Sequence, residues 1–233
     1  MTARDAGRWS RLPTEHRNPR SHTLDRLSAE GVVALLLDED RRALLAAFRS
    51  RRVVARAASE VARAIEAGGR VVFLGAGTSG RLGVLEAAEC PPTFGTNPRR
   101  ISAVMAGGDR AVFRALEGTE DRADRGRREG RRLRRGDVLV GISASSVTPF
   151  VRGALAAARA RGARTVLVTC AGSGRGLADV VVSVRTGPEV LAGSTRLKAG
   201  SATKAVLNAI TTTAMVRLGK AYENLMVDLR PGY

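Results

Sequence analysis

Five short apolar runs, rich in β-branched residues, recur between residues 70 and 187 and constrain the fold more than any other feature of the chain. Most run directly into glycine or serine, and segments long enough for helices separate the first four. Strands that are apolar along their whole length are typical of a parallel sheet covered by helices on both faces. The pattern therefore predicts an α/β fold, a Rossmann-like three-layer α-β-α sandwich around a mainly five-stranded parallel sheet. The runs are RVVFLGAG (70–77), ISAVMAGG (101–108), DVLVGISAS (137–145), RTVLVTCAG (164–172) and DVVVSVRTG (179–187), and the helical segments between them cover residues 81–89, 109–135 and 148–161.

Helical patterns flank this alternation on both sides. Residues 1–22 are polar and interrupted by two prolines, which predicts an extended arm. Residues 23–67 carry apolar side chains at helical spacing and stop at a pair of glycines, a pattern that predicts two or three helices with a C-terminal cap. A last helical stretch is expected from about residue 194 to 225.

The formal net charge of +17 raises the question of an anionic partner such as nucleic acid. Only three of the 39 basic residues are lysines, so the excess of arginine is a compositional bias of the whole chain. Aromatic residues make up 3% of the chain and leave few rings on which bases could stack. The densest arginine run, residues 122–137, spreads around a helix and is read as a solvated face. Nucleic-acid binding is therefore disfavoured.

Cysteine usage and the length of the apolar runs bear on the compartment. The two cysteines, Cys90 and Cys170, belong to no C-x-x-C pair and to no metal-ligand spacing, so a reduced, metal-free protein is expected. The N-terminus has no apolar run resembling a signal peptide. The longest uncharged run in the apolar C-terminal part, residues 205–216, is 12 residues long, well below the roughly 20 that span a bilayer. We expect a soluble cytoplasmic protein with no membrane partner.

The loop after the first run contains a literal G-x-G-x-x-G at Gly75, Gly77 and Gly80. A dinucleotide-binding site also requires an acidic residue about 20 positions further along the chain, to bind the ribose hydroxyls. That region reads TNPRR, so the dinucleotide interpretation is disfavoured. Thr78 and Ser79 add hydroxyls that can bind another anionic ligand or cap the helix expected from residue 81.

A second loop, SASSVTP, ends the third run and carries four hydroxyls, those of Ser143, Ser145, Ser146 and Thr148. Pro149 then begins a predicted helix. Hydroxyls beside a helix N-terminus suit a phosphate monoester, and we favour that interpretation over a plain loop or cap.

Carboxylates follow both of the first two runs. Glu86 and Glu89 lie one turn apart on a helix that Pro91 and Pro92 are expected to end. Three more acids are expected to close the next helix, and spacing alone does not choose a catalytic group among them. They are Glu117, Glu120 and Asp121.

Seven segments, in order and spanning residues 14–228, resemble the N-acetylmuramic acid 6-phosphate etherases, sugar-phosphate-binding proteins of the sugar isomerase (SIS) fold. The most specific are GAGTSGRLG…EAAECPPT and GSTRLKAG. The resemblance implies an N-terminal arm and helices over residues 1–50 and an SIS domain over residues 51–233. The remaining segments are TEHRNPRSHTLDRLS, MAGGDRA, LEGTED, GISASSVTPFV and GKAYENLMVD.

The resemblance implies a lyase that cleaves the D-lactyl ether of N-acetylmuramic acid 6-phosphate without metal or cofactor. Glu89 would protonate the leaving lactate oxygen and Glu120 would be the base at C2, and the resemblance leaves open the reverse division of these two roles. The SASSVTP loop would hold the phosphate, with Thr78 and Ser79 near the sugar. The resemblance also implies a homodimer, and four further residues that complete the sugar-phosphate site, in part across the dimer interface. They are Glu15, Asn18, Arg196 and Lys198.

The chain departs from the family in two places. The family usually reads S-A-S-G-R-T-P, so Ser146 replaces a glycine and Val147 an arginine, which predicts a changed backbone angle and the loss of a charge. The family's C-terminal helical segment is also expected to be absent. These departures keep a second hypothesis open, a catalytically weakened sugar-phosphate-binding regulatory protein. An aldose–ketose isomerase on the same fold is the third.

Overall fold

The computed structural model describes residues 16–172 and 174–228. Its centre is a sheet of five parallel strands in the order β2-β1-β3-β4-β5, and each strand falls within one of the five apolar runs. The order places β1 and β3 next to each other, with Val71 paired to both Ile101 of β2 and Val138 of β3. The prediction of a parallel five-stranded sheet is confirmed. The strands are β1 (Val71–Gly75), β2 (Ile101–Met105), β3 (Val138–Ile142), β4 (Arg164–Thr169) and β5 (Val180–Ser183).

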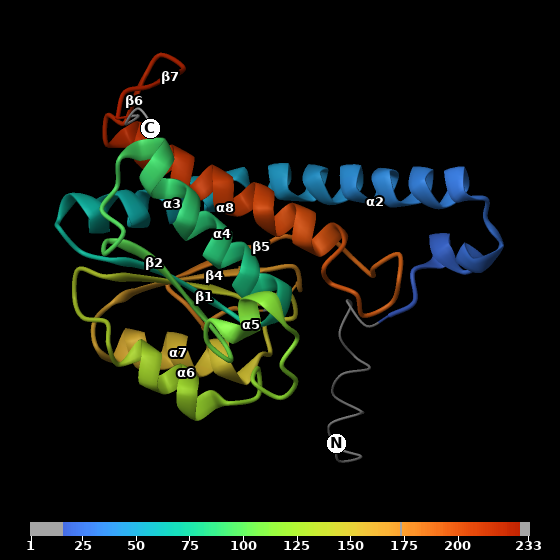
Figure 1. The fold of residues 1–233 in the computed structure, drawn as a ribbon, viewed down its shortest axis with the longest axis horizontal. Coiled ribbons are helices and arrows are strands. Elements are labelled where there is room, and N and C mark those ends of the chain that lie inside the picture. The colour runs from blue at the N-terminus through green and yellow to red at the C-terminus, as the bar shows by residue number, and fades with distance from the viewer. Residues whose placement is uncertain (1–15, 173, 229–233) are drawn as a thin grey trace.

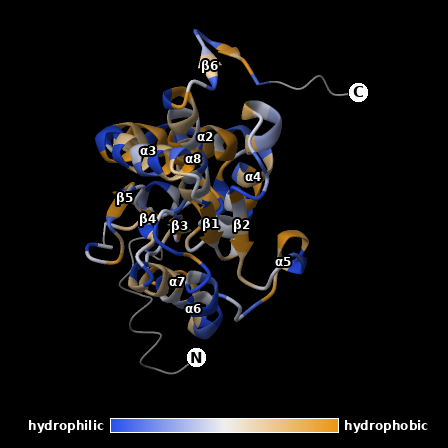
Figure 2. Cartoon of the chain, turned by 90° about the vertical axis from the view of Figure 1, so that its left-hand side faces the viewer, coloured by the Kyte–Doolittle hydropathy of each residue, from blue (hydrophilic) through white to orange (hydrophobic). Residues whose placement is uncertain are grey.

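Helices cover both faces of the sheet, which confirms the three-layer sandwich (Figures 1 and 2). One layer contains α3, α4 and α8, with α2 packed outside it against α8. The other contains α6 and α7, packed against each other. The bounds are α2 (Ala29–Arg49), α3 (Arg51–Glu66), α4 (Gly77–Phe94), α6 (Ala123–Gly130), α7 (Pro149–Ala160) and α8 (Lys198–Arg217).

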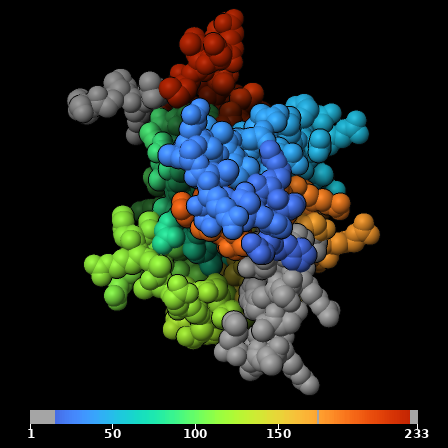
Figure 3. Space-filling model, turned by 90° about the vertical axis from the view of Figure 1, so that its right-hand side faces the viewer, coloured from blue at the N-terminus to red at the C-terminus, as the bar shows by residue number. Residues whose placement is uncertain are grey.

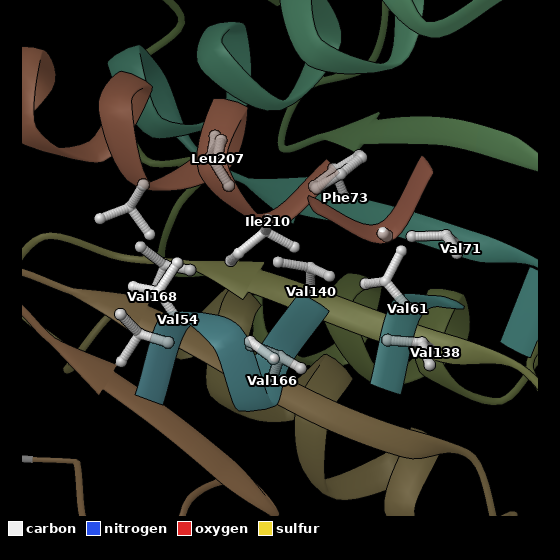
Figure 4. Close-up of a cluster of buried hydrophobic side chains, with 14 of the residues drawn as sticks. Val54, Val61, Val71, Phe73, Val138, Val140, Val166, Val168, Leu207 and Ile210 are labelled. Atoms are coloured by element: carbon white, nitrogen blue, oxygen red, sulfur yellow. The ribbon is translucent and has the colours of Figure 1, made fainter. Parts of the chain in front are cut away.

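The apolar core has two parts, one on each face of the sheet. Phe73 and Val140 point to the face covered by α3 and α8, where they meet Ile210 (Figure 4). Leu74 and Leu139, the next residues on their strands, belong to the cluster on the opposite face. Because successive side chains of a strand point to opposite faces, a sheet buried on both sides needs continuous apolar runs, and this is the pattern in the sequence.

The arginine-rich helix α6 packs through its glycines. A Cβ on Gly126 would lie 1.9 Å from the main-chain oxygen of Phe150, and one on Gly130 would lie 2.2 Å from that of Ala154. Both glycines are buried, whereas Arg125, like the other arginines of α6, is exposed. The arginines of α6 are therefore solvent-exposed, and the choice of a solvated face over a phosphate patch stays a prediction.

The end of α4 differs from the prediction. The helix begins at Gly77, four residues early, and it runs through Pro91 and Pro92 to Phe94 instead of ending at the prolines. The prolines lie in the last turns, where the ring geometry fits helical φ. Gly95 ends the helix in a left-handed conformation at φ 62°, with its N–H bonded to the oxygen of Pro91 at 2.9 Å.

The segment over residues 109–135 contains two short helices, α5 (Arg110–Phe113) and α6, with a loop between them. Glu117, Glu120 and Asp121 therefore lie in a loop and do not close a helix, contrary to the prediction. Gly118 has a φ of 75°, which is incompatible with a continuing helix.

Two further boundaries differ from the prediction. Helix α8 ends at Arg217, and a short hairpin of β6 (Ala221–Tyr222) and β7 (Leu225–Met226) follows. The described part of the arm is not simply extended, because it forms a 3-10 turn at Pro19–Ser21 (η2). The segment predicted to be helical from residue 23 begins with a second 3-10 turn, Leu24–Arg26 (η3). Within the described ranges, no helix is both long and apolar enough to cross a bilayer.

Candidate functional site

A cavity of about 410 Å³ lies where β1, β2 and β3 end. The start of α4, the segment from α5 to Glu120, and the loop after β3 form most of its wall. Carboxyl ends of parallel strands are where open α/β sheets bind ligands. Five residues that the sequence predicted for the site line this cavity: Thr78, Ser79, Glu120, Ser145 and Thr148.

The G-x-G-x-x-G loop brings the start of α4 close to the end of β1. A Cβ on Gly75 would lie 2.7 Å from the nitrogen of Gly80, so this approach excludes side chains. Gly77 has a φ of 54° with open space around it. Thr78 and Ser79 lie in the first turn of α4, and no side chain caps that helix. Its first N–H groups are therefore available to an anion, as the helix dipole favours.

The SASSVTP loop presents a second helix N-terminus to the cavity. The hydroxyls of Ser143 and Thr148 are 2.8 Å apart and bonded to each other, and α7 has no side-chain cap. Ser145 and Thr148 line the cavity, whereas Ser143 and Ser146 are buried and do not. Ser146 has a φ of 62°, so a serine occupies the left-handed conformation that favours glycine. A contact of Ser143 or Ser146 with substrate stays a prediction.

Glu120 lies in a loop that is attached at both ends. Its main-chain oxygen accepts a hydrogen bond of 2.9 Å from the amide of Phe150, in the first turn of α7. At the other end, the Arg81 guanidinium donates to the oxygens of Ala111 and Val112 at 2.9 and 2.8 Å. Sequence reasoning did not single out Arg81, although its position directly after the G-x-G-x-x-G was the available signal.

The two glutamates of α4 have different surroundings. Glu86 is buried and accepts from the Thr211 hydroxyl, with Lys204 Nζ at 3.4 Å. Glu89 is exposed and does not line the cavity. It follows Thr78 by eleven residues on the same helix, which is about 16 Å along the axis. The structure of a single chain therefore does not bring Glu89 and Glu120 together.

Asn18 and Lys198 do not line the cavity, and they meet at a buried carboxylate that sequence reasoning missed. Asn18 Nδ2 donates to Glu39 Oε2 at 2.9 Å, Lys198 Nζ donates to the same oxygen, and Arg20 Nη1 donates to Oε1 at 2.6 Å. Burial alone would raise the pKa of Glu39, but these donors outweigh it and hold the pKa below its ordinary value. Asn18 and Lys198 thus fasten the arm to α2 and α8, and a contact with substrate stays a prediction.

The other two predicted binding residues are not placed at the cavity. Arg196 is exposed and does not line it. Glu15 lies outside the described residues. A role for either one in binding stays a prediction.

A second buried carboxylate lies at the start of α8. Glu189 Oε1 accepts from the amide of Ala199 at 3.0 Å, whereas Oε2 is buried without a partner among the described residues. Burial raises the pKa of Glu189, although the Ala199 amide and the Lys198 charge oppose the shift. The helix N-terminus explains why a carboxylate is tolerated there.

Thiol chemistry does not fit this site. Cys90 and Cys170 are buried, and burial raises their pKa values to about 12 and about 11. Neither thiol is ionised near neutral pH. In the part of the chain that the structure describes, no group of three or more His, Cys, Asp and Glu side chains could hold a metal ion.

Comparison with solved structures identifies the fold. The chain superposes on a phosphoheptose isomerase from Francisella tularensis with a TM-score of 0.63 at 16% identity, covering 82% of this chain and 100% of that one. It superposes on the Vibrio vulnificus NanR protein complexed with ManNAc-6P with a TM-score of 0.56 at 16% identity, covering 81% and 63%. The family model of the glucokinase regulatory protein N-terminal SIS domain matches residues 53–159. The fold is that of an SIS domain.

Sequence comparison gives the family. An N-acetylmuramic acid 6-phosphate etherase from Gloeobacter violaceus is 51% identical over 222 residues, which cover 94% of this chain and 72% of the relative. This sequence identity of 51% is far above the 16% identity to each of the two solved structures. The chain belongs to the N-acetylmuramic acid 6-phosphate etherase family, and it is a lyase.

Proposed function

We propose that the protein cleaves the D-lactyl ether of N-acetylmuramic acid 6-phosphate, giving N-acetylglucosamine 6-phosphate and D-lactate. The observation that carries the proposal is the position of Glu120, in one cavity with the uncapped N-terminus of α4 and the hydroxyls of Ser145 and Thr148. The N-terminus of α4 and the hydroxyls of Ser145 and Thr148 suit a phosphate, and Glu120 supplies a base beside it. Similarity to relatives named for this activity supports the same assignment.

The chemistry follows from the position of the ether oxygen, on C3 and therefore β to the C1 aldehyde of the open-chain sugar. In the proposed reaction, the Glu120 carboxylate takes the C2 proton, the C3–O bond breaks, and Glu89 protonates the departing lactate oxygen. A water molecule then adds across the resulting C2=C3 bond, with hydroxyl at C3 and a proton at C2. Acid and base roles on two carboxyl groups need different surroundings, and Glu89 and Glu120 lie in different elements.

Glu89 does not line the cavity that holds Glu120, so we propose that a second copy of the chain supplies this glutamate. We therefore include a homodimer in the proposal, with Glu120 of one protomer and the partner's Glu89 at each site. The exposure of Glu89 at the surface of α4 is compatible with this arrangement. The expected cytoplasmic location stays a prediction.

The reaction proposal is tested by running the reaction in D₂O and in H₂¹⁸O. Elimination followed by addition predicts N-acetylglucosamine 6-phosphate with deuterium at C2 and ¹⁸O at C3, and D-lactate that keeps its original ether oxygen. A product without deuterium at C2 excludes proton abstraction there, and with it the role of Glu120 as base.

A second function is favoured by one observation. Val147 stands where the family usually has arginine, and strain at Ser146 accompanies it in the same loop. Such a site could bind a sugar phosphate without turnover, as expected of a regulatory protein. Tight binding of N-acetylmuramic acid 6-phosphate, measured by calorimetry, with no lactate released at high protein concentration would support this function over the lyase.

A further inference from the structure

Helix α2 carries an exposed apolar stripe that the catalytic proposal does not use. Val33, Leu37, Leu44 and Phe48 are 55%, 64%, 46% and 64% exposed. Their spacings of four, seven and four residues put them on one face of the helix. The buried side of α2, which includes Ala43, packs against α8. These four residues, the α2 stripe, therefore remain open in a single chain.

The N-terminal part of α2 lies at an accessible end of the molecule. It projects beyond the sheet in Figure 1 and, together with the residues before it, forms the blue surface that faces the viewer in Figure 3. Large apolar side chains gathered on one exposed helix face mark an interaction site more often than a free surface. The nature of the occupant follows from the symmetry of the stripe.

The α2 stripe is symmetric about the midpoint between Asp40 and Arg41. Val33 and Phe48 are equally far from that point, and so are Leu37 and Leu44. When two such helices pair antiparallel about a two-fold axis, Val33 lies opposite the partner's Phe48, and Leu37 opposite the partner's Leu44. A surface that matches itself in this way is what an isologous dimer requires.

Charge on α2 follows the same symmetry. In the antiparallel pair, Asp40 is opposite the partner's Arg41, although in its own chain Asp40 accepts from Ser201 of α8 at 2.9 Å and Arg41 donates to Asp38 at 2.7 Å. The exposed Glu30 is opposite the partner's Arg51, the first residue of α3. The Arg51 guanidinium lies 4.7 Å from the centre of the Phe48 ring, so it is already held at the end of the stripe. The first half of α2 is acidic and the second half basic, which favours antiparallel over parallel pairing.

We propose that the α2 stripe is a homodimer interface in which α2 of a second copy of this chain packs antiparallel, with the two-fold axis between Asp40 and Arg41. This rests on the homodimer included in the proposed function and names the surface that forms it.

Sedimentation velocity at micromolar concentration tests the surface. The wild type should sediment as a dimer, and Leu37→Glu should raise the dimer dissociation constant at least ~10-fold, since it places a carboxylate in the apolar contact. Leu37 is 64% exposed, so this variant should unfold thermally as the wild type does. The matched control is Leu45→Glu. Leu45 is 47% exposed on the same helix, about 100° around from Leu44, and its variant should stay dimeric.

Disulfide cross-linking tests the register. The native thiols are buried with raised pKa values, so introduced surface cysteines should react selectively. An equimolar mixture of Leu37→Cys and Leu44→Cys should form a cross-linked dimer faster than either variant alone. Faster linkage of Leu37→Cys to itself would overturn the antiparallel register.

The remaining outcomes separate the two proposals. A dimeric wild type whose dimer survives Leu37→Glu overturns the α2 stripe as the interface and leaves the homodimer standing. Loss of the dimer in both Leu37→Glu and Leu45→Glu also overturns it, because the effect does not follow the stripe. A monomeric wild type overturns both proposals and assigns the stripe to a different occupant.

Discussion

The amide of Phe150 donates a 2.9 Å hydrogen bond to the main-chain oxygen of Glu120. This bond joins the loop that carries the proposed base to the first turn of α7, beside the loop proposed to hold the phosphate. The two parts of the site therefore have a fixed relative position before substrate arrives. Such preorganisation lowers the entropic cost of aligning the base with the C2 proton.

Arg81 fixes the other end of the Glu120 loop, and its removal should lower the rate more than the affinity. Arg81→Lys cannot reproduce the paired donation to the oxygens of Ala111 and Val112. We expect kcat for lactate release to fall by about 10- to 100-fold with KM changed less. Arg99→Lys, at an exposed position, is the control. Unchanged kcat in Arg81→Lys would show that the clamp does not position Glu120.

Ser146 should be a source of strain that glycine relieves. Its φ is 62°, a conformation that costs more free energy for a residue with a Cβ than for glycine. Ser146→Gly should therefore raise the free energy of unfolding by about 1 kcal/mol in urea titration. Ser145→Gly, in the same loop without a positive φ, should lower it. A destabilised Ser146→Gly protein would contradict the strain account.

Glu189 should make stability depend on pH. Its folded-state pKa lies above the unfolded value because of burial. The protonated form therefore contributes stability that is fully present below the unfolded pKa and is lost as pH rises through the folded pKa. Glu189→Gln keeps the acceptor for the Ala199 amide and removes the buried charge. At a pH above the folded-state pKa of Glu189, the free energy of unfolding of the variant should therefore exceed that of the wild type by about 1 kcal/mol. The gain should disappear at acid pH.

Thermal unfolding across pH measures this difference. Glu66→Gln, at an exposed position, should show no such trend. A Glu189→Gln protein that is less stable than the wild type at alkaline pH would contradict the assignment of Glu189 as a buried carboxyl with a raised pKa.

Mixing two inactive variants tests whether the partner supplies Glu89. If each site uses Glu120 of one protomer and the partner's Glu89, Glu89→Ala and Glu120→Ala should each be inactive alone. After subunit exchange, half of the dimers are mixed and each has one intact site, so about a quarter of wild-type activity should return. If activity does not return although exchange is shown by mass spectrometry, both glutamates belong to one chain.

The sequence predicted the sheet well because each strand is marked by a continuous apolar run of neighbouring residues. Phe73 and Leu74 occupy opposite faces of β1, and both faces are covered, so a continuous apolar run was sufficient to identify the strand. Helix ends were less accurate. Pro91 and Pro92 are ordinary helix-ending signals, yet α4 contains both and ends at the Gly95 cap.

The site was predicted in part, for a similar reason. Thr78 and Ser145 follow strands directly, so strand order alone brings them to one edge of the sheet. Lys198 illustrates what the sequence could not predict. Lysine is scarce in this chain, and that scarcity suggested that Lys198 contacts a ligand. Its partner, Glu39, lies 159 positions away, and only tertiary packing brings the two together.

Release of D-lactate from N-acetylmuramic acid 6-phosphate is the measurement that tests the central claim most directly. The wild type should form D-lactate and N-acetylglucosamine 6-phosphate in equal amounts. Glu120→Ala should lower the rate by at least ~100-fold, the range expected for loss of a general base, while phosphate-dependent binding is retained. No lactate from the wild type, or undiminished release by Glu120→Ala, would contradict the account.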